Sequence, residues 1–416
     1  MHDANNLKAS EAAAVMPPTP PTPYTPRLSR RVRLAICWTH VSGYMASCWR
    51  TLAQHPDIDL YVGVLGLKGA DNAGFRERAL LEGIKHDVFD EAAHLRELPK
   101  RVVAHNPDVV VLAGWHQAGF RAMPSLGELR DCKFVMTMDT PWRWHPRQLM
   151  GRVAHRSYFA KMSRVVVAGE RTWMLARWLG FSERQIVRGT YAIDTQSFAS
   201  TYARRVTRDG GWPRAFLYMG RYVQEKGIDV LIDAHRRYAV RVTNPWPLDC
   251  YGQGPLAHLL EGPAGVSNRG FVQPKDQPGV MEQAGCFVLP SRYEPWGVVL
   301  AEAAASGLPL IASESCGASV DLVQHLYNGY RVTTDDAEHL ARAMGWMHEH
   351  WARLPELGRR SNELAGPFSN LIWRDRWLLM IEEIMGQTGQ SSLASTPSSA
   401  LGSPNRAHPI REQQQP

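Results

Sequence analysis

The 416-residue sequence lacks any apolar run that approaches about 18 residues, the length of a membrane-spanning helix. We also expect no signal peptide, because the apolar stretch 12–16 is too short for one and runs directly into prolines. We therefore expect a cytoplasmic protein, and we expect any contact with a membrane to be peripheral and on its inner face.

Cysteine is scarce and scattered. No pair of cysteines has metal-ligand spacing, and several fall in apparent strands, so we expect reduced, packed thiols. No Asp, Glu or His cluster has ligand spacing either. Asp57 and Asp59 resemble a metal-binding D-x-D pair, but they begin an alternating strand, where a solvated strand end is the simpler interpretation. We therefore expect no metal site. The six cysteines are at positions 37, 48, 132, 250, 286 and 316.

Acidic residues are scarce in one basic stretch. Between Trp142 and Arg188 the sequence contains ten arginines and lysines but only two acidic residues, Glu170 and Glu183. The net charge of the whole chain is +7. Two interpretations stay open: a solvated helical face, or a surface that meets anionic lipid or a phosphorylated acceptor. Nucleic acid is not an expected partner, because no recognition motif accompanies the charge. The ten cations are Arg143, Arg147, Arg152, Arg156, Lys161, Arg164, Arg171, Arg177, Arg184 and Arg188.

The two ends of the chain contain little that could be buried. Residues 1–30 include a stretch at 17–26 in which prolines alternate with threonines, and residues 387–416 are rich in Ser, Gln and Pro, so we expect two disordered tails. The whole chain is 44% hydrophobic and is too long for one ordinary core, which predicts two domains.

Strand-like and helix-like segments alternate between the tails, which predicts an α/β protein with parallel sheets covered by helices on both faces. We expect two doubly wound domains that face one another, at residues 31–199 and 214–366, joined by an Arg/Gly/Ser/Thr-rich linker at 200–213. The predicted strands cover residues 32–38, 58–65, 108–113, 133–138, 164–168, 215–219, 248–251, 266–271, 286–289 and 310–312. The predicted helices cover 44–54, 92–105, 147–162, 170–179, 226–238, 255–261, 276–284, 297 onward, 337–350, 355–364 and 371–385.

Ligands of open parallel sheets bind beyond the carboxyl ends of the strands, which selects a small set of candidate residues. Glycines there let a backbone approach a phosphate closely. Arginine and lysine supply charge for a diphosphate, and carboxylates accept bonds from several hydroxyls. The candidates are Ser42–Gly43, Trp115–His116 and Asp139 in the first half, and Gly220–Arg221, Lys226, Gly252–Gly254 and Arg292–Glu294 in the second.

The stretch 286–306, CFVLPSRYEPWGVVLAEAAAS, predicts a buried strand, a turn that contains Glu294, and a helix that contains Glu302. Pro295 keeps Glu294 extended, because a residue before proline avoids helical angles. A fully helical intervening stretch would separate the two glutamates by roughly 12 Å. That separation suits two polar ends of one elongated ligand better than a single metal ion.

Several segments, taken in their order along the chain, resemble segments of the retaining GT-B glycosyltransferases of family four, the glycosyl transferases group 1. The resemblance is dense over residues 192–332 and thin before them. It implies a GT-B fold, in which two Rossmann-like domains enclose a cleft and the last helix, at 367–386, crosses back to the first domain with Trp373 and Trp377 as anchors. The segments are AIDTQSF (192–198), GRYVQEKGIDVLIDAH (220–235), YGQGPL (251–256), RGFVQP (269–274) and SRYEPWGVVLAEAAASGLPLIAS (291–313).

The resemblance implies roles for individual residues. Arg221 and Lys226 match the pair that neutralises the donor's diphosphate. Glu294 matches the carboxylate that binds hydroxyls of the transferred sugar, and Glu302 matches the one that holds the ribose. The remaining donor-binding residues are Gly220, Gly254 and the helix start at Trp296, Gly297 and Val298, whose backbone amides would point at the donor. Gly43 resembles a first-domain glycine that approaches the phosphates, with a plain turn glycine as the alternative.

The implied reaction transfers a sugar from a UDP- or GDP-sugar to a hydroxyl of a glycan or lipid-linked acceptor, with retained configuration. Arg221 and Lys226 would stabilise the leaving diphosphate, and the family uses neither a metal nor another cofactor. In this family the leaving phosphate helps to deprotonate the incoming hydroxyl.

The first domain leaves two candidates open. His116 is the histidine nearest to the family's catalytic position, with a loop histidine as the alternative, and Asp139 stands where some relatives have another histidine and is assigned to the acceptor side. Two other classes of function also stay open: a nucleotide-sugar epimerase, hydrolase or phosphorylase of the same shape, and a non-catalytic scaffold.

Overall fold

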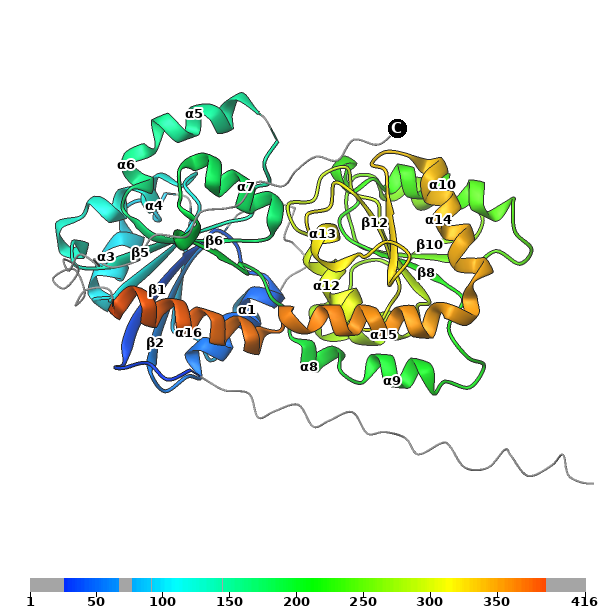
Figure 1. The fold of residues 1–416 in the computed structure, drawn as a ribbon, viewed down its shortest axis with the longest axis horizontal. Coiled ribbons are helices and arrows are strands. Elements are labelled where there is room, and N and C mark those ends of the chain that lie inside the picture. Colours follow the sequence, from blue (N-terminus) through cyan, green and yellow to red (C-terminus); the bar gives the residue numbers. More distant parts are fainter. Residues whose placement is uncertain (1–25, 67–76, 91, 144, 387–416) are drawn as a thin grey trace, which may run out of the picture.

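A computed structural model describes residues 26–66, 77–90, 92–143 and 145–386. The predicted disorder of the two tails falls almost entirely on residues outside these ranges. The described chain forms two α/β domains, each built on one parallel sheet (Figure 1).

The first domain contains a seven-stranded parallel sheet with the order β3-β2-β1-β4-β5-β6-β7. Its central strands are largely apolar because both faces are covered by helices. Along β1, Leu34 and Ile36 lie in one hydrophobic cluster, and Ala35 and Cys37 lie in the other. The strands are β1 (Val32–Trp38), β2 (Ile58–Leu65), β3 (His86–Phe89), β4 (Val109–Ala113), β5 (Lys133–Met138), β6 (Met162–Val167) and β7 (Ile186–Arg188).

Helices cover both faces of this sheet. They are α1 (Gly43–Ala53), α2 (Glu77–Leu80), α3 (Glu97–His105), α4 (Ala118–Ala122), α5 (Pro146–Ala154), α6 (Arg156–Phe159) and α7 (Glu170–Leu179).

The second domain contains a six-stranded parallel sheet with the order β10-β9-β8-β11-β12-β13. Its strands are β8 (Phe216–Met219), β9 (Leu248–Tyr251), β10 (Val266–Asn268), β11 (Cys286–Leu289), β12 (Leu310–Ser313) and β13 (Gly329–Val332). Its helices are α8 (Thr195–Phe198), α9 (Thr201–Val206), α10 (Ile228–Ala239), α11 (Gln277–Glu282), α12 (Val298–Ala305), α13 (Ala318–Leu322), α14 (Ala337–Glu349) and α15 (Leu354–Ala365).

Each sheet reverses its strand order once, between β1 and β4 in the first domain and between β8 and β11 in the second. Ligand crevices of open α/β sheets lie at such reversals. The predicted fold class, two doubly wound Rossmann-like domains, is therefore confirmed.

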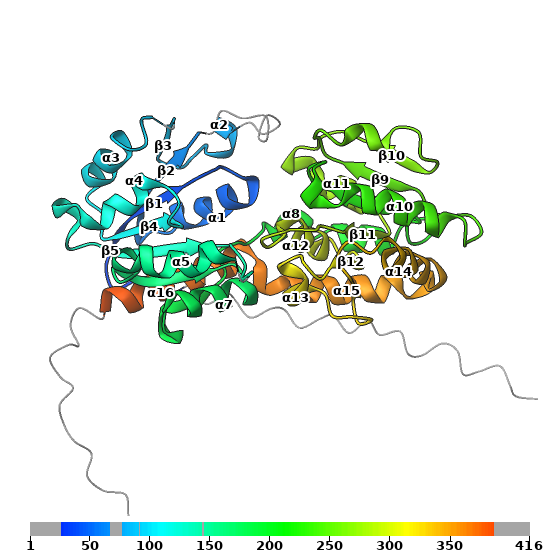
Figure 2. The ribbon, with the colours of Figure 1, turned by 90° about the horizontal axis from the view of Figure 1, so that it is seen from above.

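The chain crosses between the domains twice, and the two crossings lie side by side. The Ile193 N–H donates to the Phe368 carbonyl at 2.9 Å, and the Asn370 N–H donates to the Ile193 carbonyl at 2.8 Å. After the second crossing, α16 (Asn370–Gly386) continues from the end of α15 and runs along the first domain, where it packs against α1 (Figures 1 and 2). The buried Trp373 indole donates to the Thr190 carbonyl at 3.1 Å.

The segment predicted as a linker contains helix α9, which packs on the second domain. Arg205 of α9 is fully buried, and its guanidinium donates to the carbonyls of Ser306, Gly307 and Met281 at 2.7, 3.1 and 2.6 Å. Two of these carbonyls lie just beyond α12, where a cation interacts favourably with the helix dipole. Residues 200–213 are therefore anchored to the second domain.

Several predicted helices differ from the observed ones: the helix predicted over 255–261 is a 3-10 helix at Ala257–Leu260, and two helices of the first domain differ more strongly. The helix predicted over 92–105 begins only at Glu97, because the Asp90 carboxylate accepts the N–H groups of Ala92 and Ala93 and forms a turn. The helix predicted over 147–162 is divided into α5 and α6 at His155. Among the described helices, none is long and apolar enough to cross a membrane.

Candidate functional site

A cavity of about 920 Å³ lies between the two domains. Its lining comes mainly from the segments that follow β1, β5 and β7 of the first domain and β8, β9, β10 and β11 of the second, at the carboxyl ends of the strands. The structure therefore brings the predicted strand-end residues of both halves together at one site. The sequence-predicted site residues that line it are Gly43, Asp139, Gly220, Arg221, Lys226, Gly254, Glu294, Trp296, Gly297, Val298 and Glu302.

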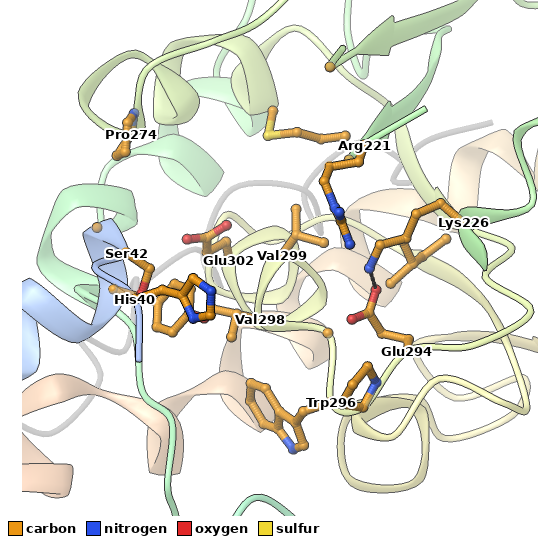
Figure 3. A pocket seen from close by; sticks show the side chains of 18 of the residues that line it. His40, Ser42, Arg221, Lys226, Pro274, Glu294, Trp296, Val298, Val299 and Glu302 are labelled. Carbon is orange, nitrogen blue, oxygen red and sulfur yellow. Dashed lines mark hydrogen bonds and ion pairs between the residues drawn. The ribbon is translucent and has the colours of Figure 1, made fainter. Parts of the chain in front are cut away.

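The cationic pair lies on the second domain's side of the cavity. Arg221 follows β8 after Gly220, and Lys226 ends a short 3-10 turn ahead of α10. Figure 3 shows both side chains pointing to the same part of the cavity, where Lys226 forms an ion pair with Glu294. The two paired side chains are only 16% and 11% exposed, so water screens their interaction poorly.

The Glu294 turn is tied to the Lys226 segment by a second set of bonds. The Arg292 guanidinium donates to both Asp229 oxygens and to Asp335, each at 2.7 Å. These bonds raise the pKa of Arg292 above its usual range. The backbone N–H groups of Arg292 and Tyr293 both donate to the Glu225 carbonyl, at 2.8 and 3.0 Å. Arg292 therefore acts as a positioning residue that fixes Glu294 relative to Lys226.

Glycines line the cavity where two backbones meet. A Cβ on Gly252 would lie 1.9 Å from the Gly220 carbonyl oxygen, and a Cβ on Gly254 would lie 2.5 Å from that of Tyr222. Only glycine fits at these two positions without backbone movement. The predicted glycine candidates therefore serve the close packing of the two loops that form this wall.

Helix α12 points its N-terminus at the cavity. Gly297 precedes it in the left-handed conformation (φ 98°), and no side chain caps the helix. The first two residues of the helix, Val298 and Val299, line the cavity. A helix start without a capping side chain leaves N–H groups available to an anion. The Trp296 side chain is buried between Tyr191 and Phe368, so it serves packing between the domains.

Glu302 lies one turn further along α12 and is partly buried. Burial raises the pKa of its carboxyl to about 7. Figure 3 shows Glu302 on the opposite side of the cavity from the Lys226–Glu294 pair. The two glutamates thus occupy separate parts of one cavity, as their sequence spacing predicts.

The first-domain wall contains a hydrogen-bonded pair. The Tyr191 hydroxyl donates to the Asp139 carboxylate at 2.8 Å. Burial and the nearby Asp139 charge raise the pKa of Tyr191 well above its usual value, so the phenol stays protonated as a donor. Tyr44 packs edge-on against Tyr191, with ring centroids 5.6 Å apart. Asp139 is therefore held in a fixed orientation at the cavity.

The domains touch at Gly43, the first residue of α1. A Cβ on Gly43 would lie 3.0 Å from the Pro274 side chain of the second domain. Ser42 caps α1 by accepting the Met45 N–H at 3.4 Å. A larger residue at position 43 would therefore push the two domains apart at the cavity.

His116 does not line the cavity. Its ring stacks on Trp115 with centroids 5.2 Å apart, and its carbonyl accepts a bond from Arg121 at 2.8 Å. The histidine that does line the cavity is His40, which follows β1 and points inward (Figure 3). The strand-end rule selected Ser42 and Gly43 from the same loop, so this rule could have found His40 too.

The Asp57–Asp59 pair and Trp142 also lie away from the cavity lining. Asp57 and Asp59 lie at the start of β2, as expected for a strand end. Trp142 packs against the Trp178 ring at 5.1 Å and covers part of the core. Within the described ranges, no three His, Cys, Asp or Glu side chains come together as a metal site would require.

Comparisons with known proteins agree with this architecture. Residues 213–350 match the family model of the glycosyl transferases group 1. Among curated proteins, the D-rhamnosyltransferase WbpZ of Pseudomonas aeruginosa is 27% identical over 52% of this chain and 56% of its own length. The lipopolysaccharide core biosynthesis glycosyltransferase LpsE of Rhizobium meliloti is 31% identical over 39% of this chain and 48% of its own length. The chain thus spans about half the length of these two curated relatives.

Solved structures extend the similarity of the fold to both domains. A glycosyltransferase from Rickettsia africae aligns over 86% of this chain and 99% of its own, with a TM-score of 0.66 and 15% identity. Anabaena HepE in complex with UDP aligns over 86% and 100%, with a TM-score of 0.65 and 18% identity. Residues 213–350 are therefore similar to the glycosyl transferases group 1, and the described chain has the GT-B fold.

Proposed function

We propose that this chain is a retaining glycosyltransferase that moves a sugar from a UDP- or GDP-sugar to a hydroxyl of a glycan or lipid-linked acceptor. The observation that carries the proposal is the convergence of Arg221, Lys226, Glu294 and Glu302 on one cavity between two domains. The names of WbpZ and LpsE support a role in polysaccharide or glycoconjugate biosynthesis. The UDP complex of HepE supports a nucleotide-sugar donor.

The proposed chemistry follows from which part of the donor each of these four side chains would bind. A bound diphosphate would attract the Lys226 ammonium and the Arg221 guanidinium, which releases Glu294 to accept hydroxyls of the transferred sugar. As the diphosphate departs, its growing negative charge is stabilised by the same two cations and by the α12 start. The two cations therefore supply the charge neutralisation of the reaction, and we propose that it needs neither a metal ion nor another cofactor.

The acceptor would approach along the first-domain wall. Asp139, held by Tyr191, is placed to accept a hydrogen bond from an acceptor hydroxyl, and His40 faces the same cavity from the β1 loop. We assign both to acceptor and sugar binding, with His40 in place of His116. We also place the protein in the cytoplasm, in peripheral contact with the inner face of the membrane.

A thermal-shift panel of UDP, GDP and ADP with their sugars tests donor binding, and donor hydrolysis tests the role of Glu294. Glu294→Ala should lower hydrolysis by at least about a hundredfold, because it removes an interaction with the sugar in the transition state. The matched control is Glu261→Ala, an exposed glutamate of the same domain. The product anomer and the rate in EDTA test retention and metal independence.

Each alternative predicts a different result. A scaffold would bind none of the three nucleotides. An epimerase or hydrolase would convert the donor at full rate without any acceptor and give no transfer product. Hydrolysis by Glu294→Ala at the parent rate would show that Glu294 does not contact the donor sugar.

A further inference from the structure

Helix α5 exposes a strip of apolar side chains. Leu149, Met150 and Val153 are 40%, 67% and 79% exposed, and Met174 of the neighbouring α7 is 52% exposed. At 3.6 residues per turn, the three α5 positions fall within an arc of about 100°. Single exposed apolar residues are ordinary, but a contiguous strip on one helix marks an interaction surface.

The surroundings of this strip are strongly basic. Residues 140–169 contain six arginines and lysines and no aspartate or glutamate. Arg152 and Arg156 are exposed beside the strip, and the Arg152 guanidinium lies over the Trp178 ring at 5.6 Å. An apolar strip flanked by cations is the pattern of a helix that lies in the headgroup region of an anionic bilayer.

Other cations of the basic stretch are already engaged within the protein. Arg164 is buried and pairs with Glu383 at 3.4 Å, Arg188 pairs with Glu170, and Arg171 donates to the Glu314 carbonyl of the second domain. The stretch is therefore not one uniform solvated face. Its outward-facing charge includes Arg152 of α5 and Arg156 of α6.

The position of α5 connects this surface to the cavity. Asp139 lines the cavity, and the segment that follows it leads directly into α5, while Arg143 in between lies over the Tyr293 ring of the second domain at 4.5 Å. Figures 1 and 2 show α5 at the periphery of the first domain, away from the second sheet. A surface that docks through α5 would thus lie next to the proposed acceptor side.

We propose that α5 docks the protein on an anionic phospholipid bilayer, with Leu149, Met150 and Val153 inserted and with Arg152 and Arg156 on lipid phosphates. A second copy of this chain is the weaker occupant, because a symmetric contact through α5 would bring like charges together. The proposal deepens the proposed function, since docking presents a lipid-linked acceptor to the Asp139 wall.

The test is co-sedimentation of the full chain with vesicles of phosphatidylcholine alone or of phosphatidylcholine and phosphatidylglycerol in equal parts. The parent should bind only the anionic vesicles, and added salt should weaken the binding. The triple variant Leu149→Gln/Met150→Gln/Val153→Gln should bind at least about tenfold more weakly. The double variant Arg152→Gln/Arg156→Gln should bind anionic vesicles more weakly than the parent, by about fivefold for each arginine removed.

The matched control is Leu95→Gln/Val240→Gln/Leu379→Gln, whose three residues are 50%, 82% and 51% exposed elsewhere on the surface. It should bind anionic vesicles like the parent. Nucleotide thermal shifts and donor hydrolysis in the absence of vesicles should be the same in all variants, so a failure of docking is distinguishable from a failure of the proposed function.

Three results would overturn the proposal: no binding of the parent to anionic vesicles, equal binding to neutral vesicles, or unchanged binding of the triple α5 variant. A parent dimer in sedimentation velocity that the triple variant converts to a monomer would also overturn it, because the strip would then be a self-interface.

Discussion

Glu302 lies in the cavity with a carboxyl whose pKa is raised by burial from 4.5 to about 7. An unfolded chain ionises this carboxyl near its ordinary pKa, whereas the folded chain keeps it protonated up to about pH 7. Unfolding therefore releases a proton between these values, and the free energy of unfolding falls as pH rises through that window. A ribose whose hydroxyls donate to Glu302 would favour the ionised form and recover part of this free energy.

Replacing Glu302 should remove this pH dependence. We expect Glu302→Gln to gain stability relative to the parent as pH rises from 4.5 to 7, by about 2 to 3 kcal/mol, and to keep a constant difference above pH 7. Urea unfolding of both proteins at a series of pH values measures the difference, and other titrating groups cancel because both proteins share them. Parallel stability profiles would show that the Glu302 carboxyl is not desolvated in the free protein.

The choice between two histidines shows where prediction from single residues stops. The motif segments predicted Arg221, Lys226, Glu294 and Glu302 correctly as cavity residues, because each lies a fixed distance from a strand end or helix start. His116 also follows a strand, but its ring stacks on Trp115. Side-chain direction in a loop depends on its neighbours in space, which the sequence does not specify.

At the scale of elements, the turn into α12 depends on one glycine. Gly297 has φ 98°, and a Cβ there would lie 2.8 Å from Cys316 Sγ and 3.0 Å from Glu294 Cγ. Both the backbone conformation and the contacts disfavour any other residue. Because one contact is with Glu294 itself, a change at Gly297 should act on the site as well as on stability.

We expect Gly297→Ala to lower the free energy of unfolding by about 2 to 3 kcal/mol and to weaken donor hydrolysis through displacement of Glu294. Gly345→Ala is the matched control, since Gly345 lies within α14 and an added Cβ would meet no atom within 4 Å. The control should be neutral or gain up to about 1 kcal/mol. Chemical denaturation and donor hydrolysis measure the two effects, and equal behaviour of the two variants would contradict the prediction.

The predictability of each element follows its burial. β1, β2 and β5 were predicted to the residue, because their nearly continuous apolar runs are buried on both faces. β3, with the sequence HDVF at a sheet edge, was missed because it has few apolar residues and pairs on one side. Helix α9 was not predicted because its segment is polar. Its buried Arg205 donates hydrogen bonds to carbonyls that lie far along the chain, which the local sequence does not reveal.

At the scale of the molecule, the two domains are joined by adjacent crossings and touch again across the cavity. The crossings pair at Ile193 and Asn370, whereas Gly43 and Pro274 meet on the cavity lining. Any widening of the cavity to admit a donor must therefore separate Gly43 from Pro274 while the crossings act as the hinge. Helix α16 lies beyond the second crossing, so it belongs to the first domain in space and to the second in sequence.

Truncation of α16 tests this division. The helix buries Trp373, Trp377 and Ile381 in the same cluster as β1, β2 and α1. Loss of one such side chain costs about 3 kcal/mol, and loss of the whole helix exceeds the roughly 5 to 15 kcal/mol that stabilises a domain. We therefore expect a chain that ends at Ser369 to lose the calorimetric transition of the first domain and to keep that of the second.

The control is a chain that ends at Gly386, which keeps α16 whole and should melt like the full-length protein. Trp373→Ala supplies an intermediate case, because it removes the indole and its bond to the Thr190 carbonyl but leaves the helix in place. It should lower the stability of the first domain by about 3 to 5 kcal/mol. If the chains that end at Ser369 and Gly386 melted alike, the first domain would be stable without α16, and the helix would only cover a core that is already complete.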